Sequence, residues 1–163
     1  MIVIRGYQPQ DSKELAKIFE NAILAIDNRI YSTSQKQAWI GNRSDEYWQS
    51  RFEQTKPFVA VVDDIVVGFI EFGFDDGIGE IDCFYVEPTM QGQGVGKALF
   101  DKVLSVAKDN DVIQINVNAS HIAKAFFEKQ DFQTVQKNSV ERSGVILENW
   151  LMVWKNKKES YEN

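Results

Sequence analysis

The sequence predicts a single α/β (α+β) domain with a mixed, mostly antiparallel β-sheet that carries helices on both faces. Two patterns lead to this fold class: expected antiparallel hairpins, and between them a strand–loop–helix–strand crossover. With 163 residues, of which 44% are hydrophobic, the chain can bury one core. We therefore expect a domain at residues 1–154 and a polar tail at residues 155–163.

The N-terminal segment begins with a strand and continues into helices. Ile2 to Arg5 has strand composition, and Asp11 and Glu14 have the spacing of a helix capping box. Apolar residues then recur at helical spacing: Leu15, Ile18, Phe19, Ala22, Ile23 and Ile26. Residues 31–54 are polar but rich in aromatic side chains, which indicates one or two short helices.

The middle of the chain predicts a hairpin followed by a central strand. Residues 58–62 and 66–72 are apolar runs separated by Asp63-Asp64, a turn pair. A glycine-rich segment, residues 73–79, then leads into a strand at residues 80–86.

The remaining pattern completes the crossover and adds a second hairpin. The expected elements are a helix from Val95 to about Asn110, a strand at 112–117, a helix at 120–129, and a hairpin of 132–140 with 145–154 around Ser143-Gly144.

Composition excludes several classes of protein. A formal net charge of −6 disfavours broad binding to nucleic acid or to an anionic membrane. No apolar run is long enough to span a bilayer, and the N-terminus lacks a signal-peptide pattern. Cys83 is the only cysteine and His121 the only histidine, so neither an intramolecular disulfide nor a metal site is expected. We expect a cytoplasmic protein.

The most informative segment is a glycine loop between a strand and a helix. Gly92, Gly94 and Gly96 alternate after the apolar run 81–86, and the apolar-periodic helix begins at Val95. Glycines allow close approach of a ligand to the backbone, and the first amides of a helix have no intrahelical acceptor. The helix dipole also favours negative charge there, so the loop is expected to bind a phosphorylated ligand.

Two common phosphate loops do not fit this spacing. A Walker A loop needs a glycine five positions before its Gly-Lys pair and a hydroxyl residue after it, but Gln91 and Ala98 occupy these positions. In a dinucleotide fingerprint the third glycine comes one residue later than Gly96.

The pattern Gln91-x-x-Gly94-x-Gly96, following a strand and Val86-x-Pro88, resembles the pyrophosphate loop of the GNAT superfamily of N-acetyltransferases. The order of elements agrees with the GNAT fold from about residue 2 to residue 154. The resemblance implies acetyl-CoA as co-substrate. Tyr31, Gln35 and Trp39, spaced by four, are similar to a pattern in a bacterial, uncharacterised subgroup of the family.

The resemblance also implies which residues hold the donor. The loop residues expected to bind the pyrophosphate are Gln91, Gly92, Gln93, Gly94, Val95, Gly96 and Lys97. Backbone groups of Phe84 and Val86 are expected to bind the pantetheine arm and polarise the thioester carbonyl. Asn118, Ser120 and Phe127 occupy positions expected to lie near the coenzyme, and Ser120 is equally suited to be a plain helix N-cap.

Acetyl transfer to an amine needs a proton acceptor. Period-two alternation puts Glu80, Asp82, Phe84 and Val86 on one face of the strand. Glu80 lies where some GNAT enzymes carry a general base, so it is our first candidate; Asp82 is the second and Glu71 the third. The alternative is that these acids are solvated or ion-paired.

The family often carries a tyrosine that protonates the departing thiolate, but Phe127 occupies that position. A thiol with a pKa of about 8.5 can leave as the thiolate near neutral pH. Tyr85 and His121 are possible substitutes; Tyr85 is better suited to the core and His121 to an exposed helix start.

The acceptor pocket is expected between the first helix and residue 58, together with the final hairpin. Tyr31 and Trp39 are candidate pocket residues, with core packing as the alternative. We predict transfer of an acetyl group to a primary amine of a small molecule by direct attack on the thioester. The alternatives are a non-catalytic acyl-CoA sensor and a peptide or protein N-acetyltransferase. Many relatives dimerise, so a homodimer is a further expectation.

Overall fold

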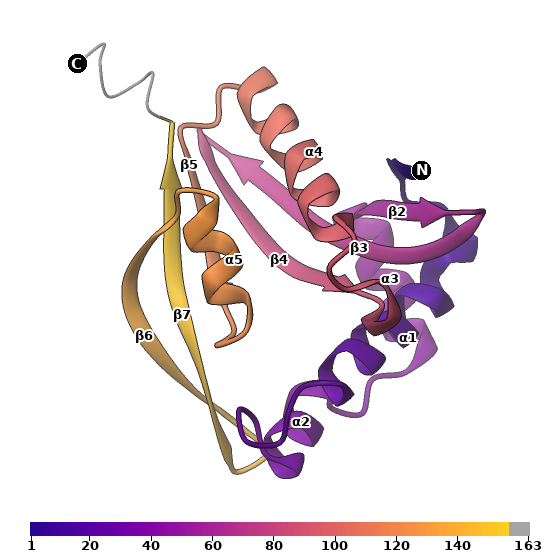
Figure 1. Ribbon diagram of the computed structural model, residues 1–163, viewed down its shortest axis with the longest axis vertical. Coiled ribbons are helices and arrows are strands. Elements are labelled where there is room, and N and C mark those ends of the chain that lie inside the picture. The colour runs from indigo at the N-terminus through magenta and orange to yellow at the C-terminus, as the bar shows by residue number, and fades with distance from the viewer. Residues whose placement is uncertain (157–163) are drawn as a thin grey trace. The chain divides into compact units, whose positions relative to one another are not determined.

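The structure, a computed structural model, describes residues 1–156 and contains seven strands and five α-helices there (Figure 1). In chain order, the strands and helices are β1 Ile2–Gly6, η1 Pro9–Asp11, α1 Ser12–Leu24, α2 Thr33–Ile40, α3 Asp45–Thr55, β2 Phe58–Val62, β3 Ile65–Asp75, β4 Ile78–Val86, η2 Pro88–Met90, α4 Val95–Asp109, β5 Gln114–Ala119, α5 Ala123–Lys129, β6 Gln133–Arg142 and β7 Val145–Lys155. The helix and hairpin predictions are confirmed, including two short helices within residues 31–54.

The strands pair in the order β1-β2-β3-β4-β5-β7-β6. Strands β4 and β5 are parallel, with a register that runs from Ile78 opposite Gln114 to Ile81 opposite Val117. The pairs β1–β2, β2–β3, β5–β7 and β6–β7 are antiparallel. The predicted mixed, mostly antiparallel sheet is therefore confirmed. Only the parallel pair requires a crossover, and α4 provides it.

The chain divides into two compact units. The first comprises Met1–Glu71 with Cys83–Val103, and the second comprises Phe72–Asp82 with the described residues from Leu104 to Asn156. The predicted domain boundary at residue 154 stays a prediction, because the structure describes nothing beyond residue 156.

Helices cover both faces of the sheet within the first unit. Phe69 of β3 packs in an aromatic and aliphatic core with residues of α1 and α3. Its neighbour Gly68 points to the opposite face, where a Cβ atom would lie 3.2 Å from side-chain atoms of Val95 and Leu99 in α4. A larger residue at position 68 would therefore push α4 off the sheet.

The start of α1 differs from the predicted capping box. Asp11 makes no side-chain cap to the helix. Its carboxylate accepts instead from Arg5 of β1, at 2.7 and 2.9 Å, and from the Gln8 amide at 2.9 Å. The charged, bidentate Arg5 is a stronger donor than a backbone amide of the helix, so Asp11 pairs with Arg5. The Asp11–Glu14 spacing therefore does not form the predicted capping box.

The turns follow the expected chemistry except at one place. Asp63-Asp64 and Ser143-Gly144 both have positive φ, as two-residue hairpin turns require. Residues 73–79 were expected to lead into a strand, but β3 continues to Asp75 and β4 begins at Ile78, with Asp76-Gly77 as the turn. The segment does lead into β4, and Gly73 and Gly79 lie within the strands rather than in the turn.

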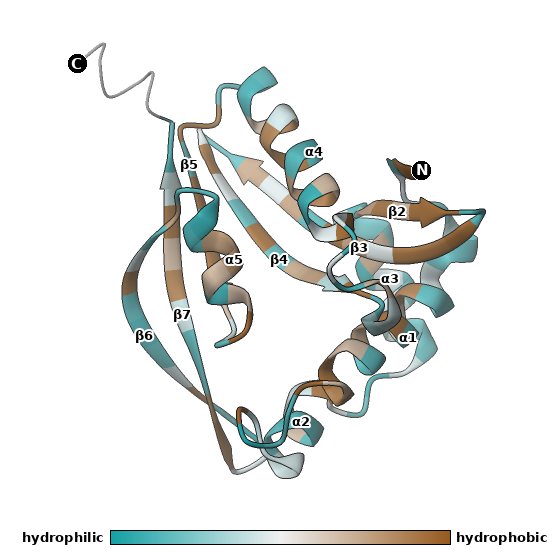
Figure 2. Ribbon diagram, viewed as in Figure 1, coloured by the Kyte–Doolittle hydropathy of each residue, from teal (hydrophilic) through white to brown (hydrophobic). Residues whose placement is uncertain are grey.

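The second unit has its own buried residues on β5, α5 and β7. Ile115, Phe127 and Met152 are each at most 1% exposed. Strand β6 contributes little to this core, and Figure 2 shows it mostly in hydrophilic colours while β2 is mostly hydrophobic. Within residues 1–156, no helix combines the length and apolarity that crossing a bilayer would need.

Candidate active site

The glycine loop enters α4 with left-handed backbone. Gly92 has φ +78° and Gly94 has φ +85°, values that are costly for any residue with a Cβ atom. The first hydrogen bond of α4 runs from the Ala98 amide to the Gly94 carbonyl, at 3.0 Å. The amides that precede Ala98 at the helix start have no intrahelical acceptor and are suited to bind an anion.

Contacts at both ends hold this loop in place. The Gln91 side chain donates to the Val86 carbonyl at the end of β4, at 3.4 Å, and the Glu87 amide donates to Val67 of β3, at 2.8 Å. Val95 is buried, whereas residues 91–94 are exposed. The Lys97 side chain pairs with Asp101 one turn further along the helix. The loop backbone is thus exposed to solvent, while hydrogen bonds to β3 and β4 and the buried Val95 fix its position.

The candidate bases lie on β4 within the second unit. Glu80 and Asp82 are exposed, while Ile81 and Cys83 between and after them are buried, as the alternation predicted. Glu80 has no ion pair or side-chain hydrogen bond with any residue in the described part of the chain. The ion-paired alternative therefore does not apply to Glu80. Further along, Phe84 is half-buried and Val86 is buried.

The third candidate, Glu71, has a different environment. Its side chain is 2% exposed and accepts hydrogen bonds from Arg51 (2.7 and 2.9 Å), Thr55 (2.8 Å) and the Cys83 amide (3.1 Å). Burial alone would raise the pKa of Glu71, but the hydrogen bonds and the charge of Arg51 outweigh burial and lower it. Glu71 is thus a structural carboxylate and a poor base.

Two aromatic residues of the first unit prove to be packed. Tyr85 contacts Phe19 edge-on, with centroids 5.1 Å apart, and its hydroxyl accepts from Trp39 Nε1 at 3.1 Å. Tyr31 is 2% exposed, lies just before the N-cap of α2, and packs edge-on against Trp39 at 5.4 Å. The core role of Tyr85 is confirmed, and the burial of Tyr31 favours core packing over a pocket role.

The candidate coenzyme contacts of the second unit lie on β5, on α5 and in the short connection between them. Asn118 is exposed and accepts from Asn138 at 3.0 Å. Ser120 Oγ accepts from the Ala123 amide at 3.1 Å, the bond expected of a helix cap. Phe127 is 1% exposed, with its ring centroid 5.0 Å from that of Phe132.

His121 has a fixed hydrogen-bond role. Trp150 Nε1 donates to His121 Nδ1 at 2.9 Å. An indole N–H can only donate, so Nδ1 is the acceptor in this bond. His121 is thus held against β7 through Nδ1, while its Nε2 lies 3.7 Å from a Glu148 carboxylate oxygen. The predicted position at a helix start is confirmed, but the side chain is half-buried rather than exposed.

Sequence patterns missed the partners that decide these roles. Nothing in the spacing of Arg51 and Glu71, or of Trp150 and His121, marks them as contacts. Lys36 is also buried, and its Nζ donates to the Leu24 and Ile26 carbonyls at the end of α1, at 3.1 and 2.6 Å. A lysine in a polar segment gives no sequence signal of such a cap.

A left-handed glycine loop between a strand and the crossover helix of a mixed sheet is an arrangement suited to bind a phosphorylated ligand. The family model of the acetyltransferase (GNAT) domain matches residues 27–152. The chain belongs to the GNAT family of N-acetyltransferases.

Similar proteins agree with this assignment. The chain is 32% identical over 155 residues to the uncharacterized N-acetyltransferase YafP of Escherichia coli, covering 94% of this chain and 96% of YafP. It is 25% identical over 147 residues to the peptidyl-lysine N-acetyltransferase YjaB of Salmonella typhimurium, covering 88% and 92%.

Solved structures show the same fold. A GCN5-related N-acetyltransferase from Rhodopseudomonas palustris has a TM-score of 0.86 and 28% identity, covering 94% of this chain and 95% of that one. PaiA N-acetyltransferase from Thermoplasma acidophilum, solved in complex with coenzyme A, has a TM-score of 0.76 and 19% identity, covering 96% and 99%.

Proposed function

We propose that this N-acetyltransferase moves an acetyl group from acetyl-CoA to a primary amine of a small molecule. The observation that carries the donor assignment is the pair of left-handed glycines, Gly92 and Gly94, at the start of α4 in a member of the GNAT family. A Cβ atom at either glycine would meet nothing within 4 Å, so the space beside the backbone is open to a ligand. The coenzyme A bound to PaiA supports the same donor.

The donor is held mainly by backbone. Amides from Gln91 to Lys97 bind the pyrophosphate, helped by the positive end of the α4 dipole. Amide and carbonyl groups of Phe84 and Val86 bind the pantetheine arm, and one amide stabilises the oxyanion that develops on the thioester carbonyl. Asn118 and Ser120 are further proposed contacts of the arm, because the family resemblance implies them.

The chemistry is a direct attack. The amine nitrogen forms a bond to the thioester carbonyl carbon, the C–S bond breaks, and the electron pair leaves on the coenzyme A sulfur. The proton lost by the amine passes to the Glu80 carboxylate, directly or through water. Glu80 is preferred because its side chain has no competing partner among the described residues; Asp82 is the second choice.

No side-chain acid is assigned to the leaving group. Phe127 has no proton to give, the Tyr85 hydroxyl packs in the core and accepts from Trp39 Nε1, and His121 Nδ1 accepts from Trp150 Nε1. The sulfur leaves as the thiolate and takes a proton from solvent, as a pKa of about 8.5 permits. A peptide lysine is the second candidate acceptor, which the name of YjaB favours.

Binding of the donor is tested by calorimetry with acetyl-CoA and two glycine variants. Gly94→Ala should weaken acetyl-CoA binding at least tenfold, because an alanine at φ +85° distorts the loop. Gly144→Ala is the matched control: Gly144 also has positive φ (+76°) and open space beside it, but lies in the β6–β7 turn. Equal affinity in both variants, or no binding by the wild type, would refute the donor site.

The acceptor is tested by following thiol release with a panel of free amines and of lysine-containing peptides. Turnover with free amines supports the small-molecule proposal. Turnover with peptides alone would instead make a peptide lysine the acceptor. Tight acetyl-CoA binding without turnover in either panel would make the protein an acyl-CoA sensor.

A further inference from the structure

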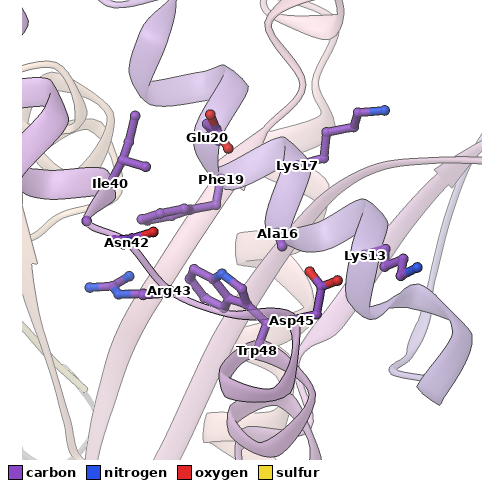
Figure 3. Close-up of a pocket in the computed structure, with 11 residues that line it drawn as sticks. Lys13, Ala16, Lys17, Phe19, Glu20, Ile40, Asn42, Arg43, Asp45 and Trp48 are labelled. Atoms are coloured by element: carbon purple, nitrogen blue, oxygen red, sulfur yellow. The ribbon is translucent and has the colours of Figure 1, made fainter.

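A hollow of about 390 Å³ lies among α1, α3 and the connection from Ile40 to Arg43 (Figure 3). All of its lining residues belong to the first unit. Ala16 of α1 leaves room, and Gly41, with φ +68°, turns the chain at the end of α2. The size is within the range of small-molecule sites. The donor loop contributes nothing to this hollow.

Arg43 is the unusual residue of the hollow. Its guanidinium carbon lies 5.4, 5.4 and 5.3 Å from the ring centroids of Phe19, Tyr47 and Trp48, so the guanidinium contacts three aromatic rings. Figure 3 shows Arg43 with Phe19 and Trp48. A stacked guanidinium keeps its N–H donors in its plane, directed outward. Arg43 is half-buried, yet it forms no ion pair or hydrogen bond with any described residue.

Three of the four other arginines show what is missing at Arg43; the fourth, Arg142, is exposed and has no ion pair in the described chain. Arg5, Arg29 and Arg51 each pair with a carboxylate, at 2.6 to 2.7 Å. A half-buried guanidinium whose donors have no acceptor loses hydration without replacing it. Its fixed orientation on the rings lowers the cost of binding an anion, because little side-chain freedom remains to be lost.

The charges around the hollow favour an anion. The lining cations are Lys13, Lys17 and Arg43, and the lining acids are Glu20 and Asp45. The three cations form no ion pair within the described chain. The hollow therefore carries a local excess of positive charge, whereas the protein as a whole has a net charge of −6. Small anions are attracted to the hollow and repelled by the negatively charged surface elsewhere.

We propose that this hollow binds a small organic anion through a carboxylate or phosphate group, which accepts a forked pair of hydrogen bonds from Arg43 while Lys13 and Lys17 add charge. The site is separate from the donor loop and does not rest on the acetyl-transfer proposal. The geometry of a guanidinium fork suits both anions.

The test is a site-resolved NMR titration of the full-length protein with inorganic phosphate and, separately, with succinate. The signals to follow are Arg43 Nε–H and Trp48 Nε1–H for the hollow, and the backbone amides of residues 92–97 for the donor loop. We expect saturable shifts at Arg43 and Trp48. The stronger of the two probes identifies the anionic group.

Variants separate the site from general electrostatics. Arg43→Gln should weaken the probe at least tenfold, read at Trp48. Arg43 also packs on three rings, so its replacement can disturb the fold as well as the site. The double variant Lys13→Gln/Lys17→Gln changes only exposed side chains, and it should weaken probe binding several-fold while the fold stays intact. Arg29→Gln, an exposed control, should leave it unchanged. Non-saturating shifts, shifts confined to residues 92–97, or equal affinity in all variants would overturn the proposal.

Discussion

Glu71 and Glu80 are both strand carboxylates, yet their surroundings give them opposite properties. Glu71 is buried and held as an ion by Arg51, Thr55 and a backbone amide. Glu80 is exposed and has no side-chain partner in the described chain. A proton on Glu71 would break several fixed contacts, whereas a proton on Glu80 would break none. The difference teaches that partners, rather than residue type, separate a structural carboxylate from a reactive one.

The largest expected effect is on catalysis at Glu80. Glu80→Gln should lower kcat by about 10²–10⁴-fold at neutral pH, the usual contribution of a general base. The KM for acetyl-CoA and the melting temperature should not change, because the side chain is exposed and unpartnered. Thiol-release kinetics over pH, with the exposed Glu46→Gln on α3 as control, measure this. Full activity in Glu80→Gln with a loss in Asp82→Asn would move the base to Asp82.

The next effect is on stability at Glu71. Arg51→Met leaves the Glu71 charge buried with only neutral donors, so the free energy of unfolding should fall by about 3–5 kcal/mol. Urea unfolding at pH 7 measures it. Lys56→Met breaks the exposed pair with Glu53 and should cost less than about 1 kcal/mol. Similar losses in the two variants would show that the Glu71 site is not the buried ion pair described.

The sequence predicts the local patterns behind this contrast but not the partners that come from distant elements. The glycine loop, the strand alternation at Glu80 and the hairpin turns are local patterns, and the structure confirms them as geometry. The partner of Glu71 comes from a helix 20 positions earlier, and the partner of Asp11 from the preceding strand. Such pairings depend on how elements pack, which a spacing rule does not contain.

Aromatic residues show the same limit. The spacing of Tyr31 and Trp39 fits a helix face equally well whether the face lines a pocket or the core. The helix begins only at Thr33, and Tyr31 packs edge-on against Trp39. The conformation of the glycine loop was easier to predict, because glycine positions report backbone conformation directly.

A smaller effect is expected in acid. The pKa of Glu71 is lowered in the folded protein, as is that of Asp11, where the bonds from Arg5 outweigh burial. Carboxylates with a depressed folded pKa stabilise the protein above their unfolded pKa, about 4, and lose this as pH falls toward the folded value. The free energy of unfolding should therefore fall below about pH 4.5, by up to about 1.4 kcal/mol per pH unit for each proton taken up.

The matched variant for this acid effect is Glu71→Gln. Its amide still accepts a hydrogen bond but does not titrate in acid, so urea unfolding from pH 7 to pH 3 should show a shallower decline than the wild type. The same slope in both proteins would mean that Glu71 titrates normally, and the contrast with Glu80 would then lose its electrostatic basis.

The smallest expected effect concerns the hydroxyl of Tyr85. Because this hydroxyl has a hydrogen-bond partner, we expect it to be structural rather than reactive, as for Glu71. Tyr85→Phe removes the acceptor of the Trp39 Nε1–H bond, so the free energy of unfolding should fall by about 1 kcal/mol. Because that hydroxyl is bonded in the core, kcat should stay within about twofold of the wild type at every pH. Trp39→Phe breaks the same bond from the other side. A tenfold fall in kcat for Tyr85→Phe but not for Trp39→Phe would make Tyr85 the missing acid, and a partnered group would then be reactive.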